Sequence, residues 1–266
     1  MRVAFAQLEP RFGDVRGNVE KAIAAVTKYQ ADLFILPELY TTGYVFLSRD
    51  EALSLAESAN DGFALRTFSE FARDNDTAVI FGFAEKDGDR VFNSCAFIDG
   101  QVAPLIYRKI HLFYDEKRIF EPGNRLLETF DYRGARLGMM ICFDWIFPEV
   151  SRSLALMGAE LICHPANLVM PYCQQAMITR SLENRVFSAT ANRIGAENRG
   201  GQTCQFTGQS QIVDIFGNVI YRASADKEEI FVADINVAEA RSKNVNEANN
   251  LWSDRRVDFY RRLEEK

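Results

Sequence analysis

The sequence predicts an α/β protein of four layers, α-β-β-α, in which two β-sheets pack face to face between helices. Short apolar runs, typical of buried strands, alternate with amphipathic stretches of helical periodicity. A short internal similarity indicates two halves: residues 31–37 resemble residues 159–165, and residues 2–6 are placed like residues 136–140. If each half is a sheet with helices on one face, the two open sheet faces must be buried against each other.

The first half is expected to contain five strands and two helices. Residues 2–7 indicate the first strand, and Asn18 is the expected N-cap of a helix that runs to about Tyr29. A strand at 32–37 ends at Pro37 and delivers Glu38 into a loop. The remaining elements are a helix at about 62–75 and strands at 78–83, 91–98 and 102–107.

The second half begins with an apolar run at 137–141 that ends on Cys142. A helix with Pro148 in its first turn follows to about Met157, so Cys142 lies at a strand-to-helix turn. The other predicted elements are a strand at 160–165, a helix at 173 to about 187, and strands near 186–192, 209–214, 218–222 and 229–234.

The tail from about residue 236 is charged and has too little apolar content for a core of its own. Its large apolar residues predict that it packs on another surface, such as a second subunit of a homodimer or larger assembly. Because no linker or shift in composition divides the chain, residues 1–266 are expected to form one domain. The apolar residues of the tail are Trp252, Val257, Phe259 and Tyr260.

Charge and cysteine content restrict the partners and the compartment. The net charge of −6 argues against nucleic acid and anionic membrane surfaces as partners. The N-terminus lacks a basic segment followed by a long apolar run, and no apolar stretch is long enough to span a bilayer. Five cysteines without CxxC spacing predict free thiols in a reducing cytoplasm and argue against a structural zinc site.

Three residues with complementary chemistry each follow an apolar run: Glu38, Lys109 and Cys142. Strand ends of one sheet can converge at one edge, where Glu can take a thiol proton, Lys can stabilise an oxyanion, and Cys can attack. A neighbouring Lys also favours the thiolate. Each residue has a simpler explanation when taken alone: Glu38 could cap a helix, Lys109 could be solvated, and Cys142 could be a small buried hydrophobe.

The two histidines, His111 and His164, are the rival bases. They would serve a Cys-His hydrolase, or they would make structural hydrogen bonds beside the strands. The structural role is favoured, because the Glu-Lys-Cys set already supplies a base.

Three segments together resemble the signatures of the carbon–nitrogen hydrolase (nitrilase) superfamily. They are Leu36-Pro37-Glu38, the run from Tyr107 to Leu112, and Cys142-Phe143-Asp144 with Pro148-Glu149. The resemblance extends over nearly the whole chain and includes Glu116, Phe120, Pro122-Gly123 and residues 164–167. It implies an α-β-β-α sandwich that dimerises, in agreement with the two halves inferred above.

The resemblance also implies roles for individual residues. Glu38 would be the general base, Cys142 the nucleophile that forms a thioester or thioimidate, and Lys109 with the backbone N–H of Phe143 the oxyanion stabilisers. Glu116 would position the substrate and Lys109. No metal and no cofactor are expected.

The same residues favour an amidase that acts on a small molecule and releases ammonia. Nitrilases of the superfamily tend to have Cys-Trp-Glu where this chain has Cys142-Phe143-Asp144, and carbamoylase branches often carry Arg where Asp144 and Trp145 stand. The alternatives are a nitrilase, an N-carbamoyl compound hydrolase, an acyltransferase, and a non-catalytic binding module. The sequence predicts a compact, partly aromatic substrate pocket, although each of its residues could equally serve only in packing. The expected pocket residues are Phe143, Tyr44, Tyr114, Trp145 and Asn167.

Overall fold

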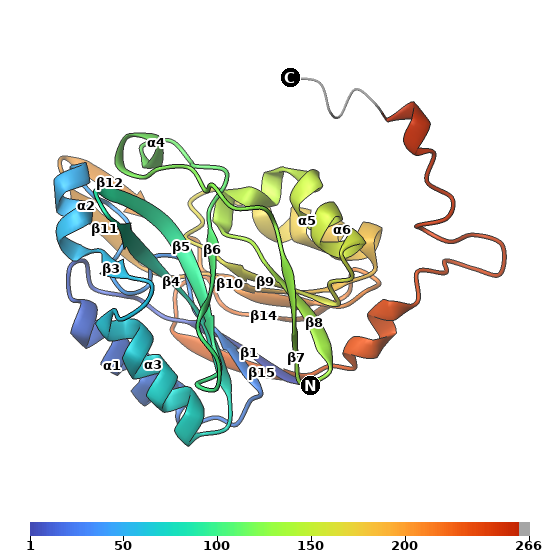
Figure 1. Cartoon of the computed structure of the whole chain (residues 1–266), viewed down its shortest axis with the longest axis horizontal. Helices are drawn as coiled ribbons and strands as arrows, with labels where there is room; N and C mark the ends of the chain where they lie inside the picture. Colours follow the sequence, from blue (N-terminus) through green and yellow to red (C-terminus); the bar gives the residue numbers. More distant parts are fainter. Residues whose placement is uncertain (261–266) are drawn as a thin grey trace.

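A computed structural model describes residues 1–260 and shows the predicted four layers, with helices outside two central sheets (Figure 1). The first sheet has the order β15-β1-β2-β4-β5-β6, with β3 paired to β4. Its strands are β1 (Arg2–Gln7), β2 (Leu33–Ile35), β3 (Glu57–Ser58), β4 (Ala78–Asp87), β5 (Arg90–Ile98), β6 (Leu105–Arg108) and β15 (Glu229–Asp234).

The second sheet has the order β14-β13-β10-β9-β8-β7. Its strands are β7 (Thr129–Tyr132), β8 (Ala135–Met139), β9 (Leu161–Pro165), β10 (Phe187–Ala191), β13 (Gln211–Val213) and β14 (Val219–Arg222). A separate hairpin consists of β11 (Ala196–Arg199) and β12 (Gln202–Gln205). The helices are α1 (Val15–Val26), α2 (Arg49–Leu55), α3 (Phe63–Asp74), α4 (Glu116–Ile119), α5 (Pro148–Leu156) and α6 (Cys173–Asn184).

The internal similarity corresponds to two equivalent β-α-β units. In the first unit β1 and β2 are parallel neighbours joined through α1, and in the second β8 and β9 are parallel neighbours joined through α5. Helices α1 and α3 lie outside the first sheet, while α5 and α6 lie outside the second (Figure 1). The two-halves prediction is therefore confirmed.

The central strands of the first sheet, β1, β2, β4 and β5, bury both of their faces, which explains their nearly continuous apolar sequences. In β1, Val3 and Phe5 belong to the core between the sheets, whereas Ala4 belongs to the core beneath α1 and α3. The alternation follows from the two-residue period of a strand. The same central core includes Leu137 and Leu161 from the second sheet.

The N-terminus of α1 differs from the prediction. Its N-cap is Asp14, whose Oδ1 accepts a hydrogen bond from the Gly17 N–H at 3.0 Å. Asn18 lies inside the helix and is buried, where its Nδ2 donates to the carbonyls of Arg11 at 2.7 Å and Thr41 at 3.0 Å. Asn18 thus joins two loops to the helix, a role that depends on residues distant in sequence.

Several short elements were not predicted: α2, α4, β3, β7 and the β11–β12 hairpin. Each of these helices and each single strand has seven residues or fewer, too few to show a clear helical or strand periodicity in the sequence. The strand before Cys142 also ends earlier than predicted, at Met139. The Ile141 N–H then donates to the Asp144 carboxylate at 2.9 Å instead of to a neighbouring strand.

The tail follows the 3₁₀ turn Val237–Arg241 (Figure 1) and keeps contact with the body of the chain. Lys243 Nζ donates to the carbonyls of Asn184 and Arg185, and Trp252 packs against the central core. Trp252 is half-buried, while Val257 and Phe259 are 55% and 73% exposed. The predicted tail also includes residues 261–266, which lie outside the described residues. Among residues 1–260, no helix has both the length and the apolar character needed to cross a membrane.

Gly82 in β4 generates a prediction about stability. A Cβ at this position would overlap the Leu39 backbone nitrogen and lie 2.5 Å from the Cα of Glu38. We expect Gly82→Ala to lower the free energy of unfolding by roughly 1–3 kcal/mol, as overpacking does, in urea unfolding experiments.

Gly138 in β8 provides the matched control. A Cβ there would lie 3.0 Å from Cδ2 of Leu154, a side-chain end that can move. Gly138→Ala should therefore destabilise the protein less than Gly82→Ala does. Equal losses would contradict the close backbone approach at Gly82.

Candidate active site

Three different strands deliver the central side chains of the site. Glu38 follows β2, Lys109 follows β6, and Cys142 opens a 3₁₀ turn after β8. Lys109 Nζ lies 2.6 Å from Glu38 Oε1, and the charges of both residues act on the Cys142 thiol. The structure therefore brings together the three residues selected from the sequence, across both sheets.

Lys109 is fully buried between two carboxylates. Besides Glu38, its Nζ contacts Glu116 Oε1 at 2.8 Å and Oε2 at 2.7 Å. Burial opposes the positive charge, but Glu116 and Glu38 together raise the pKa of Lys109 above its ordinary value. The site thus contains a permanent cation beside the thiol.

Glu116 is held from three directions. Its Oε1 accepts a hydrogen bond from the Tyr44 hydroxyl at 2.7 Å, and its Oε2 accepts one from the Phe113 N–H at 3.3 Å. Lys109 Nζ is the third partner. Burial raises the pKa of Glu116 to about 6 in spite of the neighbouring Lys109 charge. Glu116 is therefore mostly ionised at neutral pH and becomes protonated in mild acid.

Glu38 has one free oxygen. Its Oε1 accepts from Lys109 and from Asn93 Nδ2, the latter at 2.7 Å, while Asn167 Nδ2 donates to its backbone carbonyl at 2.8 Å. Its Oε2 is buried and has no hydrogen-bond partner among residues 1–260. An unpartnered buried carboxylate oxygen is an acceptor available to the thiol or to a bound molecule.

The backbone at Cys142 is held in the left-handed region, with φ of +40°. This conformation is strained for a residue with a side chain and is characteristic of functional sites. Asp144, two residues later, holds the turn in place: its carboxylate accepts from the Ile141 N–H and from Tyr107 OH at 2.6 Å, and lies 2.9 Å from His111 Nδ1. Asp144 thereby joins the turn to the strand and loop that carry Lys109.

The Cys142 thiol is protonated in the resting site. Burial and the Glu38 charge raise its pKa well above the ordinary value, and the opposing effect of Lys109 is smaller. The effect of Lys109 on the thiol has the direction expected from the sequence, but burial and Glu38 outweigh it. The thiol could act as a nucleophile only if a base took its proton, and Glu38 Oε2 is a buried acceptor without a partner among residues 1–260.

The histidines make structural contacts. His164 Nε2 lies 3.0 Å from the Cys142 carbonyl oxygen, and its Nδ1 lies 3.1 Å from Thr190 Oγ1. Burial lowers the pKa of His164 to about 4, so it is neutral at neutral pH. His111 pairs with Asp144 and stacks on Phe147, with 3.7 Å between ring centroids.

Two adjoining cavities open beside these residues. A small one of about 10 Å³ contacts Cys142 and is lined by the predicted residues Phe143, Trp145 and Asn167. A larger one of about 540 Å³ is lined by the predicted residues Tyr44 and Tyr114, together with Glu116.

Sequence reasoning missed other lining residues of these cavities. Phe113 and Val169 line both cavities, and Phe113 directly follows the Lys109 motif, a signal that was available. The hairpin residues of the larger cavity carried no such signal; they are Gly200, Gln202, Thr203, Cys204 and Gln205. Among the described residues, no cluster of three or more His, Cys, Asp and Glu side chains is placed to hold a metal ion.

Comparisons with known proteins show which family the chain resembles. A family model described as Carbon-nitrogen hydrolase matches residues 2–244. The chain is 42% identical over 263 residues to a protein named Nitrilase from Pyrococcus abyssi, with 98% of this chain and 99% of that protein covered. It is 35% identical over 232 residues to an (R)-stereoselective amidase from Pseudomonas sp, with 85% and 82% covered.

A solved structure shows a similar fold. It is a mutant of the amidase from Nesterenkonia sp. AN1, in which the acetamide moiety of fluoroacetamide is attached covalently to the active-site cysteine. The TM-score is 0.79 at 25% identity, and 98% of this chain and 95% of that chain are covered.

The protonation state of Cys142 generates a second prediction. Because burial and Glu38 raise the pKa of the thiol, wild type and Cys142→Ala should show the same thiolate absorbance in the ultraviolet at neutral pH. An excess of about one thiolate in wild type would contradict the assigned resting state. Iodoacetamide labelling of Cys142 should slow markedly in Glu38→Gln, which lacks the base.

Proposed function

We propose that this chain, which belongs to the carbon–nitrogen hydrolase family, is a cysteine-dependent amidase that hydrolyses small uncharged amides to an acid and ammonia. One observation carries the proposal. A protonated thiol at Cys142 faces a buried cation, Lys109, and a carboxylate, Glu38, that has a free oxygen. These are the nucleophile, electrophile stabiliser and base that acyl transfer requires.

In the first half-reaction, Glu38 Oε2 takes the proton of Cys142 while Sγ attacks the amide carbon. The C=O π electrons move onto oxygen, and Lys109 Nζ with the Phe143 N–H stabilises this oxyanion. One such donor typically contributes about 3 kcal/mol to the transition state. The C–N bond then breaks as Glu38 returns its proton to nitrogen, so ammonia leaves and a thioester remains on Cys142.

In the second half-reaction, water replaces ammonia. Glu38 takes a proton from water as the oxygen attacks the thioester carbon, and the same donors stabilise the second oxyanion. The C–S bond breaks, Glu38 returns the proton to sulfur, and the acid leaves. Glu116, ionised at neutral pH, keeps Lys109 charged and oriented throughout both steps.

The lining of the small cavity favours an uncharged acyl group. Phe113, Phe143, Leu168, Val169 and Met170 surround it, and among the described residues it has no Lys or Arg in its wall. A carboxylate on the substrate would be buried there without a partner, which is costly. The lining therefore disfavours a carboxylate next to Cys142, whereas the larger cavity contains an arginine, Arg118, so N-carbamoyl compounds belong in the substrate panel.

Nitrile hydrolysis is the second candidate. The 42% identical relative from Pyrococcus abyssi is named Nitrilase. Cys142 could attack a nitrile carbon to give a thioimidate, with Lys109 beside the developing negative charge. An acyltransferase would use the same set with an amine in place of water, and a binding module would leave the set unused.

Ammonia release from a panel of small amides, nitriles and N-carbamoyl compounds tests the proposal. We expect release from apolar amides, its loss in Cys142→Ala, and unchanged thermal unfolding. Cys163→Ala, which removes a buried thiol from β9, is the matched control and should keep the activity. Release from nitriles alone would favour the second candidate, and an active Cys142→Ala would exclude the nucleophile.

We also propose that the chain acts as one domain, in a homodimer or larger assembly whose interface includes the tail from about residue 236. The exposed side chains of Val257 and Phe259 support this. Five free thiols support a reducing, cytoplasmic location.

Light scattering at micromolar concentration should give at least twice the mass of one chain. Replacement of Val257 and Phe259 by Ser should weaken the assembly and increase the monomer fraction on dilution, because the apolar contact area is lost. A monomeric wild type would contradict the assembly.

A further inference from the structure

The hairpin β11–β12 holds the loop that carries Tyr44. Glu197, in β11, is almost fully buried, and its carboxylate accepts two backbone N–H groups of this loop. The Tyr44 N–H lies 3.0 Å from Glu197 Oε2 and 3.1 Å from Oε1, and the Val45 N–H lies 2.7 Å from Oε2. One carboxylate thus fixes two consecutive peptide groups.

Arg193 holds this carboxylate in place. It is fully buried, and its guanidinium pairs with Glu197 and lies 4.0 Å above the centre of the Phe206 ring. Phe206 in turn packs edge-on against the Tyr44 ring, with centroids 5.9 Å apart. The pair therefore restrains both the backbone and the ring of Tyr44.

Gly43 allows the close approach of the carboxylate. Its φ is +84°, and a Cβ there would lie 2.9 Å from Glu197 Oε1. Any larger residue would be strained and would press on the carboxylate. The local sequence around Tyr44 is thus adapted to Glu197, which lies more than 150 residues later.

The opposite end of Tyr44 reaches the candidate active site. Its hydroxyl donates to Glu116 Oε1, and Glu116 holds Lys109. We propose that Glu197 is a positioning residue for the proposed hydrolysis, because it holds Tyr44 so that the Tyr44 hydroxyl bonds Glu116 and orients Lys109. This inference rests on the proposed function for its catalytic meaning.

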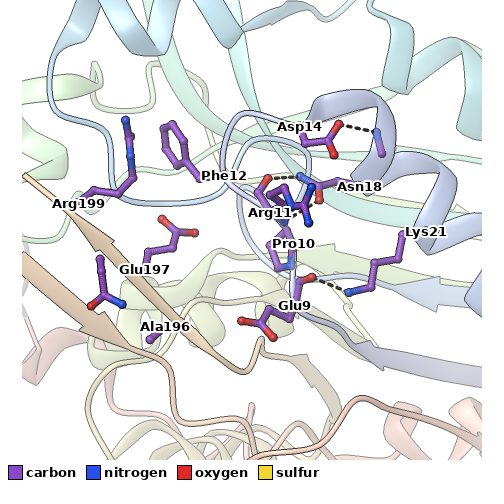
Figure 2. Close-up of a pocket in the computed structure, with 12 residues that line it drawn as sticks. Glu9, Pro10, Arg11, Phe12, Asp14, Asn18, Lys21, Ala196, Glu197 and Arg199 are labelled. Atoms are coloured by element: carbon purple, nitrogen blue, oxygen red, sulfur yellow. Dashed lines mark hydrogen bonds between the residues drawn. The ribbon is translucent and has the colours of Figure 1, made fainter.

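A separate cavity of about 710 Å³ also has Glu197 in its wall (Figure 2). Glu197, Phe12 and Arg199 form one side of it, and Asp14, Asn18 and Lys21 form the other. Glu38, Lys109 and Cys142 do not line it, so it is not the site of the reaction.

Three of the charged groups of this cavity already have partners among residues 1–260. Lys21 pairs with Glu228, Arg199 pairs with Glu51, and Asp14 caps α1. We therefore assign the wall of this cavity a structural role: through Glu197 it supports the loop that carries Tyr44.

The position of Tyr44 affects the titration of Glu116. Burial raises the pKa of Glu116 to about 6, and the bond from Tyr44 lowers it. Loss of that bond raises the pKa further, so Glu116 becomes protonated at higher pH. Activity that needs ionised Glu116 is present above this pKa and is lost as the pH falls through it.

Kinetics of Glu197→Gln, Tyr44→Phe and the double variant test the proposal. Each single variant should lower kcat about tenfold, the typical effect of a lost hydrogen bond to a charged group, and should shift the acid limb of the pH profile upward. The double variant should resemble Tyr44→Phe. Effects on kcat that multiply in the double variant would mean that Glu197 acts only through general stability, and would overturn the proposal.

Two further variants make the comparison specific. Glu51→Gln removes another ion pair of the same hairpin, with Arg199, and should leave kcat and the acid limb unchanged. Glu197→Asp keeps a charge for Arg193 but shortens the reach to the loop. If Glu197→Gln does not fold, Glu197→Asp should give the upward shift, and a wild-type profile in that variant would overturn the proposal.

An infrared titration separates this proposal from the proposed function. The protonated carboxyl band that is missing in Glu116→Gln reports the protonation of Glu116 without any substrate. Its midpoint should lie near pH 6 in wild type and higher in Glu197→Gln and Tyr44→Phe. Equal midpoints would overturn the positioning role even if amides are hydrolysed, whereas a shift without amide turnover would refute only the proposed function.

Discussion

The burial of Lys109 between Glu38 and Glu116 is the constraint on which the rest of the site depends. An ammonium group removed from water is unfavourable by several kcal/mol unless opposite charges and hydrogen bonds compensate it. Two carboxylates at 2.6–2.8 Å supply both. Burial, together with the negative charge of these carboxylates, raises the pKa of the Cys142 thiol, so the thiol rests protonated and would need a base in order to attack a substrate.

This arrangement requires several distant segments to hold their positions. Asp144 ties the strained turn at Cys142 to Tyr107 and His111, beside Lys109. On the other side, Glu197 ties the Tyr44 loop, and through it Glu116, to the β11–β12 hairpin. In both places a buried carboxylate accepts hydrogen bonds from backbone N–H groups. Asp144 and Glu197 thereby hold backbone segments that lie outside the regular strand pairing of the sheets.

The sandwich architecture explains why the site lies between the two halves. Glu38 and Lys109 follow strands of the first sheet, and Cys142 follows a strand of the second. Face-to-face packing of the sheets through a shared apolar core brings these strand ends together. The candidate active site is therefore complete only when both halves are folded and packed against each other.

The sequence by itself predicted the layers, most strands and the long helices, and it placed Glu38, Lys109 and Cys142 at the ends of apolar runs, because apolar periodicity and residue chemistry are local properties. Glu116 was selected by the family resemblance. Tertiary structure alone decided the cap of α1, the short elements, the net pKa shift of Cys142, and the contact of Glu197 with Tyr44. These depend on burial and on distances between residues far apart in the chain, which no local pattern records.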